Sequence, residues 1–70
     1  MVVLGVGIYK DTLKEIAEKG NMRAEDTPAS NVIRIYAADI PRFFEAANDA
    51  GYIAEWGQYG RIVVRRKEVV

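Results

Sequence analysis

Apolar side chains in the second half of the chain recur at the spacing of one face of an α-helix. At positions i, i+3, i+4, i+7 and i+10 stand Ile40, Phe43, Phe44, Ala47 and Ala50. Such a stripe is what an amphipathic helix buries against a core. Asp39 suits the N-cap, Pro41 is tolerated only in a first turn, and Gly51 is a typical stop. The sequence therefore predicts a helix over residues 39–50 that packs on a second layer.

A β-hairpin is predicted directly after this helix. Residues 52–56 and 61–66 alternate between apolar and polar types, and four residues with a glycine at each end, 57–60, separate them. This length and composition are typical of a hairpin loop. Tyr52, Ala54 and Trp56 share one strand face, so we expect Trp56 to pack in the core or the hairpin.

The first half of the chain predicts a strand followed by a short helix. Residues 2–9 alternate, with Val2, Leu4, Val6 and Ile8 forming a fully aliphatic face and glycines on the other. We expect the aliphatic face to be buried. A helix with Asp11 or Thr12 as its cap then runs to Gly20, with an apolar stripe of Leu13, Ile16 and Ala17.

The middle of the chain supplies one further strand. Residues 21–31 are polar and contain Pro28, which predicts a loop with room for one more helical turn. In residues 32–37, Ile33 and Ile35 are expected to face the core while Arg34 and Tyr36 face away.

The predicted fold class is α/β, with residues 1–70 as a single domain in the order β-α-β-α-β-β. Right-handed crossovers would place both helices on one face of a four-stranded mixed sheet, as a two-layer sandwich. The opposite sheet face stays open. By alternation it should carry Arg34, Tyr36, Arg61, Val63 and Arg65, together with Glu55 and Ile53, and with Val3 and Tyr9 nearby.

Composition argues against catalysis. The 70 residues contain no cysteine and no histidine, so the thiolate nucleophile and the usual proton shuttle at neutral pH are both missing. Asp11 and Asp39 are explained as helix caps, and Glu25 with Asp26 lacks the further ligands that a metal site needs. We predict no enzyme, no metal and no cofactor. The apolar runs are too short to cross a membrane and no secretory signal is present, which predicts a cytoplasmic protein.

The charges are balanced overall but uneven along the chain. The chain contains ten basic and ten acidic residues, yet residues 61–70 hold four basic side chains and only one acidic one. One interpretation is that charged residues protect an exposed strand from edge-to-edge pairing. The other makes this segment part of a binding surface, composed of Arg34, Tyr36, Tyr59, Arg61, Arg65, Arg66 and Lys67.

Two kinds of ligand fit that surface. Tyrosine and arginine are enriched at protein interfaces, and Val3, Ile53 and Val63 would add an apolar patch, which favours a protein partner or a homo-oligomer. Arginines interleaved with tyrosines on an open sheet are also used to bind RNA or single-stranded DNA.

An anion site is a separate hypothesis. The segment 5–12 leads from a strand into a helix N-terminus, where free N–H groups favour an anion. Gly5, Gly7, Lys10 and Thr12 would form it. The segment matches neither the phosphate-loop nor the dinucleotide motif, and packing of the helix on the strand explains its glycines equally well.

Residues 39–67 resemble the second half of the SirA/TusA sulfur-carrier family. The shared features are the Ile40-Pro41 helix start, the phenylalanine two residues after the proline, the glycine stop and a hairpin that closes in Val-Val-Arg-Arg-Lys. The resemblance implies a β-α-β-α-β-β fold. The family's defining Cys-Pro-x-Pro is absent, and Tyr9, Lys10, Asp11 and Thr12 stand in that region. Because a persulfide needs a thiol, such a relative would keep only a surface for the family's partners. The strand order alone also resembles the Alba chromatin proteins and the C-terminal domain of bacterial initiation factor three, which bind nucleic acids.

Overall fold

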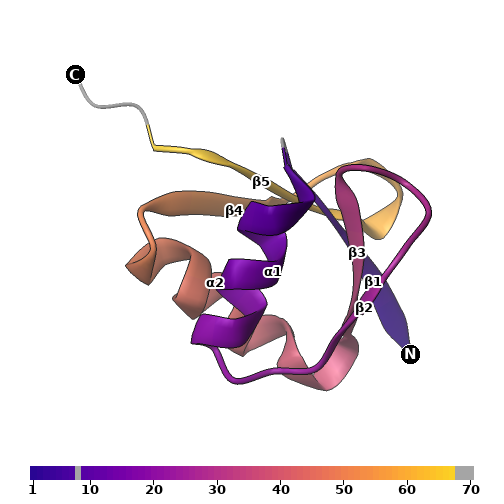
Figure 1. Ribbon diagram of the computed structural model, residues 1–70, viewed down its shortest axis with the longest axis horizontal. Coiled ribbons are helices and arrows are strands. Elements are labelled where there is room, and N and C mark those ends of the chain that lie inside the picture. Colours follow the sequence, from indigo (N-terminus) through magenta and orange to yellow (C-terminus); the bar gives the residue numbers. More distant parts are fainter. Residues whose placement is uncertain (8, 68–70) are drawn as a thin grey trace.

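Two helices cover one face of a five-stranded sheet in the computed structural model, which describes residues 1–7 and 9–67 (Figure 1). The elements in chain order are β1 (Val2–Val6), α1 (Lys10–Lys19), β2 (Ala24–Asp26), β3 (Val32–Tyr36), a 3-10 turn (Ala37–Asp39), α2 (Ile40–Asp49), β4 (Tyr52–Trp56), a second 3-10 turn (Gln58–Gly60) and β5 (Ile62–Arg66). The predicted α/β class with two helices and a mixed sheet is confirmed. No helix of the described residues is long and apolar enough to cross a membrane.

The prediction of four strands is wrong, because residues 21–31 contain β2. The strands lie in the order β2-β3-β1-β5-β4, and β2 pairs antiparallel with β3, with Glu25 opposite Arg34. A three-residue edge strand shows no apolar alternation. Of its residues only Ala24 packs against the core, while Glu25 and Asp26 are exposed. The segment therefore looked like a polar loop.

The short β2 also reverses the direction of the chain before β3. β3 consequently runs antiparallel to β1, with Leu4 opposite Arg34, whereas β5 runs parallel to β1, with Gly5 opposite Ile62. The predicted crossover from the first strand to residues 32–37 is thus wrong. The α1 connection joins β1 to β2, and β3 is inserted between these two parallel strands.

The predicted start of α2 agrees with the structure, but the predicted start of α1 does not. Asp39 is the N-cap of α2 and Pro41 lies in its first turn, although the Asp39 side chain makes no capping hydrogen bond. The N-cap of α1 is Tyr9, again without a side-chain bond. Asp11 and Thr12 lie inside the first turn of α1, so the prediction that one of them caps the helix is wrong.

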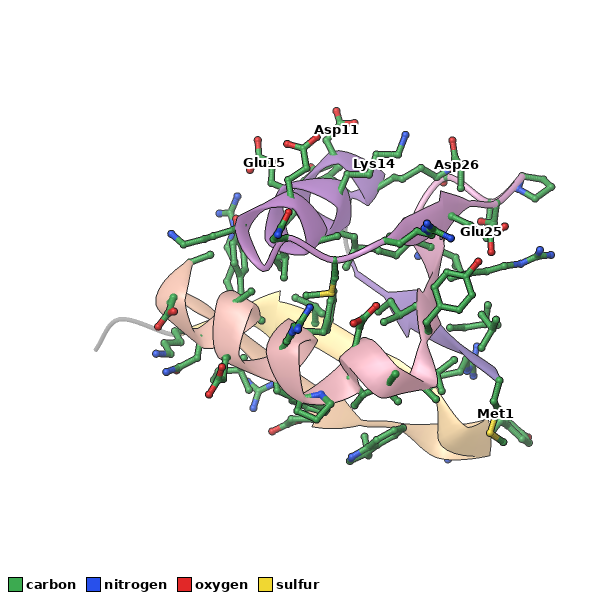
Figure 2. The ribbon with its side chains drawn as sticks, turned by 90° about the horizontal axis from the view of Figure 1, so that it is seen from below. Met1, Asp11, Lys14, Glu15, Glu25 and Asp26 are labelled. Carbon is green, nitrogen blue, oxygen red and sulfur yellow. The ribbon has the colours of Figure 1, made fainter. Side chains whose placement is uncertain are left out.

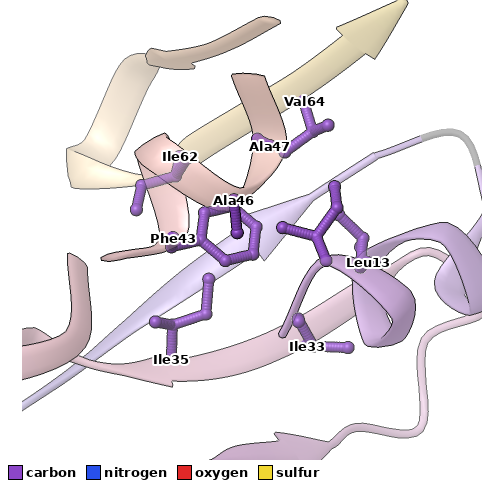
Figure 3. Packing of buried hydrophobic residues seen from close by; sticks show 9 residues of the cluster. Leu13, Ile33, Ile35, Phe43, Ala46, Ala47, Ile62 and Val64 are labelled. Atoms are coloured by element: carbon purple, nitrogen blue, oxygen red, sulfur yellow. The ribbon is translucent and has the colours of Figure 1, made fainter. Parts of the chain in front are cut away.

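The core lies between the helices and the sheet, around the ring of Phe43 (Figure 3). Its buried members are Leu13, Ile16, Ile33, Ile35, Phe43, Ala46, Ala47, Ile62 and Val64. Burying a large side chain of this kind contributes about 1.5–3 kcal/mol. Both helices and the strands β3 and β5 therefore share one hydrophobic cluster, against which Val3 of β1 packs.

The glycine side of β1, and not its aliphatic side, faces the helices. A Cβ atom on Gly5 would lie 2.7 Å from Ile35 Cδ1, and one on Gly7 would lie 3.0 Å from Leu13 Cδ2. The glycines thus leave the space that core side chains fill. Val2 and Leu4 point to the opposite face, so the predicted burial of the aliphatic side is wrong. Ile8, predicted on that side, lies outside the described residues.

Candidate binding surface

The sheet face turned away from the helices is the surface on which several predicted site residues meet. Ile33, Ile35, Ile62 and Val64 are buried under the helices, so the alternate residues of each strand point to the other side. We call this side the open face, and it comprises Val2, Leu4, Val6, Glu25, Val32, Arg34, Tyr36, Ile53, Glu55, Val63 and Arg65.

An apolar stripe crosses the middle of the open face. Val2, Leu4 and Val63 are 43%, 38% and 37% exposed. Val6 lies beside Val63 in the register of β1 with β5. The register of β1 with β3 places Leu4 beside Arg34. Aliphatic side chains of two neighbouring central strands thus form one continuous patch.

A hydrogen-bonded polar pair stands at each side of this stripe. On β2 and β3 the Tyr36 hydroxyl donates to Glu25 Oε1 at 2.7 Å, and this bond raises the pKa of Tyr36 above its ordinary value of 10.0. On β4 and β5 Arg65 Nη2 donates to Glu55 Oε1 at 3.1 Å. On the open face, the hydrogen-bond donors Tyr36 and Arg65 are therefore each bonded to a carboxylate.

The tip of the β4–β5 hairpin carries a separate aromatic and basic pair. Tyr59 is 89% exposed and adopts a left-handed backbone, with φ of 60°. The Arg61 guanidinium lies 5.5 Å from the centre of the Tyr59 ring. It also donates from Nε to the Gln58 carbonyl at 3.3 Å. The ring and the cation thus form one exposed unit.

The structure does not bring all seven predicted binding residues together. Arg34, Tyr36 and Arg65 share the open face, and Tyr59 with Arg61 forms the hairpin tip. Arg66 alternates to the helix side of β5, where it lines a crevice with Tyr9 and Tyr52. Lys67 Nζ donates to Asn48 Oδ1 on α2 at 2.8 Å. The basic residues Arg61, Arg65, Arg66 and Lys67 are therefore divided among four places.

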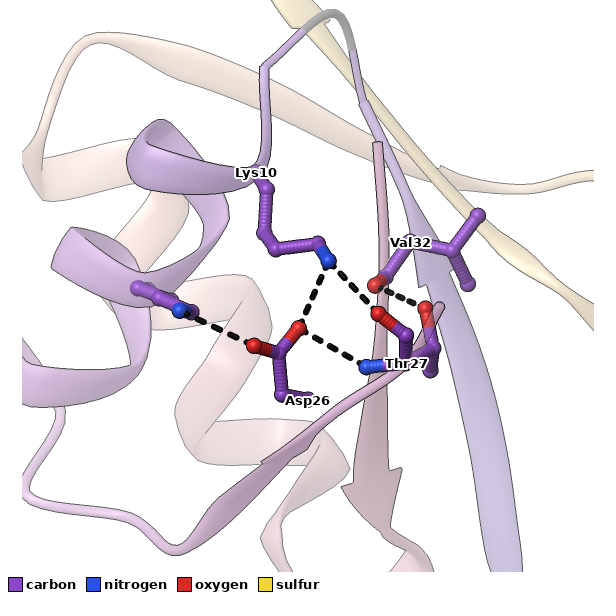
Figure 4. Close-up of polar contacts among 5 residues, drawn as sticks. Lys10, Asp26, Thr27 and Val32 are labelled. Carbon is purple, nitrogen blue, oxygen red and sulfur yellow. Dashed lines mark hydrogen bonds and ion pairs between the residues drawn. The ribbon is translucent and has the colours of Figure 1, made fainter. Parts of the chain in front are cut away.

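Of the four residues of the predicted anion site, only Gly7 and Thr12 line a common crevice. Lys10 Nζ lies 2.7 Å from Asp26 Oδ1 and donates to the Thr27 carbonyl at 2.6 Å (Figure 4). Gly5 faces Ile35 in the core, and the Gly7 N–H donates to the Asn31 carbonyl at 3.1 Å. The Lys10 charge is therefore used to hold β2 against α1.

Two hollows lie beside α1 in the described part of the chain. The crevice beside Tyr9 and Thr12 encloses about 20 Å³, which is room for one water molecule. A second hollow of about 170 Å³ lies where α1 ends, against Arg42 and Glu45 of α2. Figure 2 shows Asp11 and Glu15 pointing away from the body of the protein. Among the described residues no three acidic side chains converge on a metal position.

Sequence reasoning predicted an apolar patch on the open face that includes Val63, but it missed the contribution of β1. Val2, Leu4 and Val6 were expected in the core, and Val3, expected near the open face, packs against the core instead. A signal was present in Gly5 and Gly7, because two glycines on one strand face leave room for a helix that crosses close by.

Comparison with protein-family models, with curated proteins and with solved structures found no match for this chain. The resemblance of residues 39–67 to the sulfur carriers therefore stays a prediction.

Proposed function

We propose that this protein is a non-catalytic binding module whose open face recognises a partner protein. The observation that carries the proposal is the apolar stripe of Val2, Leu4 and Val63, which the helices leave uncovered. A small soluble domain rarely exposes a continuous apolar patch unless something covers it. In this proposal the protein works without a cofactor and in the cytoplasm.

The charges beside the stripe favour a protein over a nucleic acid. Binding to phosphates requires several cations that are free to displace counterions. On the open face Arg65 is bonded to Glu55, and Arg34 lies opposite Glu25 in the register of β2 with β3, so a carboxylate stands beside each of these arginines. An apolar centre with mixed charges around it is the usual anatomy of a protein interface.

Site-specific photo-crosslinking tests this proposal. A photoreactive residue at Leu4 should capture a protein from cells, whereas the same residue at Glu15, on the exposed side of α1, should not. With the captured protein purified, a Leu4→Glu and Val63→Glu double variant should bind at least about tenfold more weakly, which is about 1.4 kcal/mol. A Glu15→Gln variant should bind as the wild type does. Unchanged binding by the double variant would refute the use of the open face.

The hairpin tip supports RNA or single-stranded DNA as a second candidate ligand. An exposed Tyr59 ring with Arg61 beside it can stack on a base while the cation meets a phosphate. For a single-stranded oligonucleotide the affinity should then fall steeply with salt. An Arg61→Ala and Arg65→Ala double variant should lower the salt slope by about 0.7 for each phosphate that is no longer neutralised. A salt-independent affinity would exclude this candidate.

The resemblance to the sulfur carriers supports a third candidate, in which the module binds the partners of that family without carrying sulfur. The absence of cysteine excludes a persulfide on this chain. Binding of a sulfur-carrier partner by the wild type would support this candidate, provided that the Leu4→Glu and Val63→Glu variant loses it.

A further inference from the structure

The two edges of the sheet are built differently. β2 has three residues, two of them acidic, and Pro28 follows shortly after it. Short length, charge and proline are the usual protection of an edge strand. β4 forms the other edge with five residues, Tyr52–Trp56, and its one charged side chain, Glu55, is bonded to Arg65. The β4 edge therefore lacks the protection that β2 has.

The register shows which main-chain groups of β4 point outward. The Gly57 N–H donates to the Arg61 carbonyl at 2.6 Å, so these two residues form a hydrogen-bonded pair. Such pairs alternate along an antiparallel ladder. Ile53 and Glu55 consequently direct their N–H and carbonyl groups toward β5. The same groups of Tyr52, Ala54 and Trp56 point away from the sheet.

We propose that β4 pairs antiparallel with β4 of a second copy of this chain, about a two-fold axis at Ala54. In that register Tyr52 faces Trp56 of the second copy, and Ala54 faces Ala54. These are the residues whose groups point outward, and each facing pair exchanges two hydrogen bonds. One axis position thus satisfies every outward main-chain group of the strand.

The side chains on the helix side fit this register. The Trp56 ring packs on Phe44, with 5.8 Å between the ring centres, yet Trp56 is 56% exposed. Tyr52 of the second copy would stand directly across from it, and an aromatic cross-strand pair stabilises a sheet. Two alanines meet at the axis, where they leave room for the larger rings on either side.

The charges on the open face are complementary in the same register. Glu55 would face Ile53 of the second copy, and Arg65 is the neighbour of Ile53 on β5. Each Glu55 carboxylate would then lie between Arg65 of its own chain and Arg65 of the other. No two like charges stand directly opposite each other, which is the arrangement that would disfavour pairing.

The dimer would leave the apolar stripe uncovered. A two-fold axis perpendicular to the sheet sets the two open faces side by side on the same side of one continuous sheet. Failure of β4 to pair would therefore leave the proposed function of the open face intact. A dimer formed through Leu4 and Val63 would instead stack the two open faces.

Concentration-dependent amide exchange measured by NMR, together with sedimentation, tests the proposal. In the wild type the amides of Tyr52, Ala54 and Trp56 should exchange about tenfold more slowly once about nine-tenths of the chains are dimeric. Those of Ile53 and Glu55 should be protected at every concentration. Emission of Trp56, the only tryptophan in the chain, should shift to the blue over the same range. A strictly monomeric protein, or a dimer whose Tyr52, Ala54 and Trp56 amides stay unprotected, would overturn the proposal.

Two alanine-to-proline variants provide a matched pair. Ala54→Pro removes an outward N–H at the β4 edge, and Ala24→Pro removes one at the β2 edge, where proline is also tolerated. We expect Ala54→Pro to sediment as a folded monomer at concentrations where Ala24→Pro and the wild type are dimeric. A folded Ala54→Pro dimer would contradict the proposal. If Ala54→Pro does not fold, the alternating exchange pattern of the wild type decides.

Discussion

Lys10 and Asp26 form an ion pair, with 2.7 Å between Lys10 Nζ and Asp26 Oδ1, that fastens the first turn of α1 to the end of β2. Lys14 Nζ lies 3.3 Å from the other carboxylate oxygen, and the Thr27 N–H donates to Asp26 at 2.8 Å. These interactions, the Lys10 bond above all, lower the pKa of Asp26 from 3.8 to about 2. A single carboxylate thus connects a helix, a strand and the following turn.

Acid should remove the stabilisation that Asp26 contributes. Because the pKa is lower in the folded state, the contribution is complete above about pH 4 and disappears as the pH falls toward 2. We expect Asp26→Asn to be less stable than the wild type at neutral pH, with a difference that shrinks between pH 4 and pH 2. Urea unfolding at a series of pH values measures this. Asp49→Asn on α2 is the control, and an equal pH dependence of both variants would contradict the prediction.

Gly5→Ala should destabilise the fold by about 1–3 kcal/mol, because its new methyl group would crowd a filled core. The atom it meets is Ile35 Cδ1, at 2.7 Å. Ile35→Val deletes that atom and alone costs about 0.5–1.5 kcal/mol. The double variant should therefore lose less stability than the sum of the two single variants. Additive losses in chemical denaturation would show that the crowding lies elsewhere.

Phe43→Ala should destabilise the fold strongly and lower its melting temperature. The fully buried ring contributes about 3–5 kcal/mol, whereas a chain of this length has a total stability of roughly 4–10 kcal/mol. Leu4→Ala on the open face serves as the control and should cost much less. Far-UV circular dichroism during thermal unfolding distinguishes the two variants. A cooperative transition of Phe43→Ala near that of the wild type would disprove the central place of this ring.

Tyr59→Asn should stabilise the fold slightly. A left-handed backbone costs an ordinary side chain about 1–2 kcal/mol, and asparagine adopts it readily. Removing the attraction between the Tyr59 ring and Arg61 offsets about 0.5–1 kcal/mol of this gain. A net increase of about 0.5–1 kcal/mol in the free energy of unfolding is therefore expected from these two opposing effects. A decrease in stability would mean that the Tyr59 ring contributes more than its position at the hairpin tip indicates.

The strongly periodic parts of the chain could be predicted from sequence. The stripe around Phe43 and the alternation of residues 52–66 set α2 and the hairpin, since both patterns come from one face being buried. The alternation in residues 32–36 likewise placed Ile33 under the helices and Arg34 on the open face. The local sequence pattern was therefore sufficient to predict a helix or strand that has one buried face and one exposed face.

The local sequence pattern failed to predict those features that depend on contacts between distant parts of the chain. β2 exists because β3 offers it an edge, and no property of Glu25 or Asp26 alone favours a strand. In β1 both sides are apolar or glycine, so the choice of buried side depends on how near α1 and Ile35 lie. The role of Lys10 was missed for the same reason, because its partner Asp26 is 16 residues away along the chain.

The central position of β1 has a consequence for the order in which the chain can fold. Val2–Val6 lies between β3 and β5, so the first of the described strands in chain order gains its second neighbour only from the last described one. Closing so long a segment is entropically costly and slows folding. Until β5 has left the ribosome, β1 of each nascent chain keeps one side unpaired, and neighbouring nascent chains are open to mispairing there.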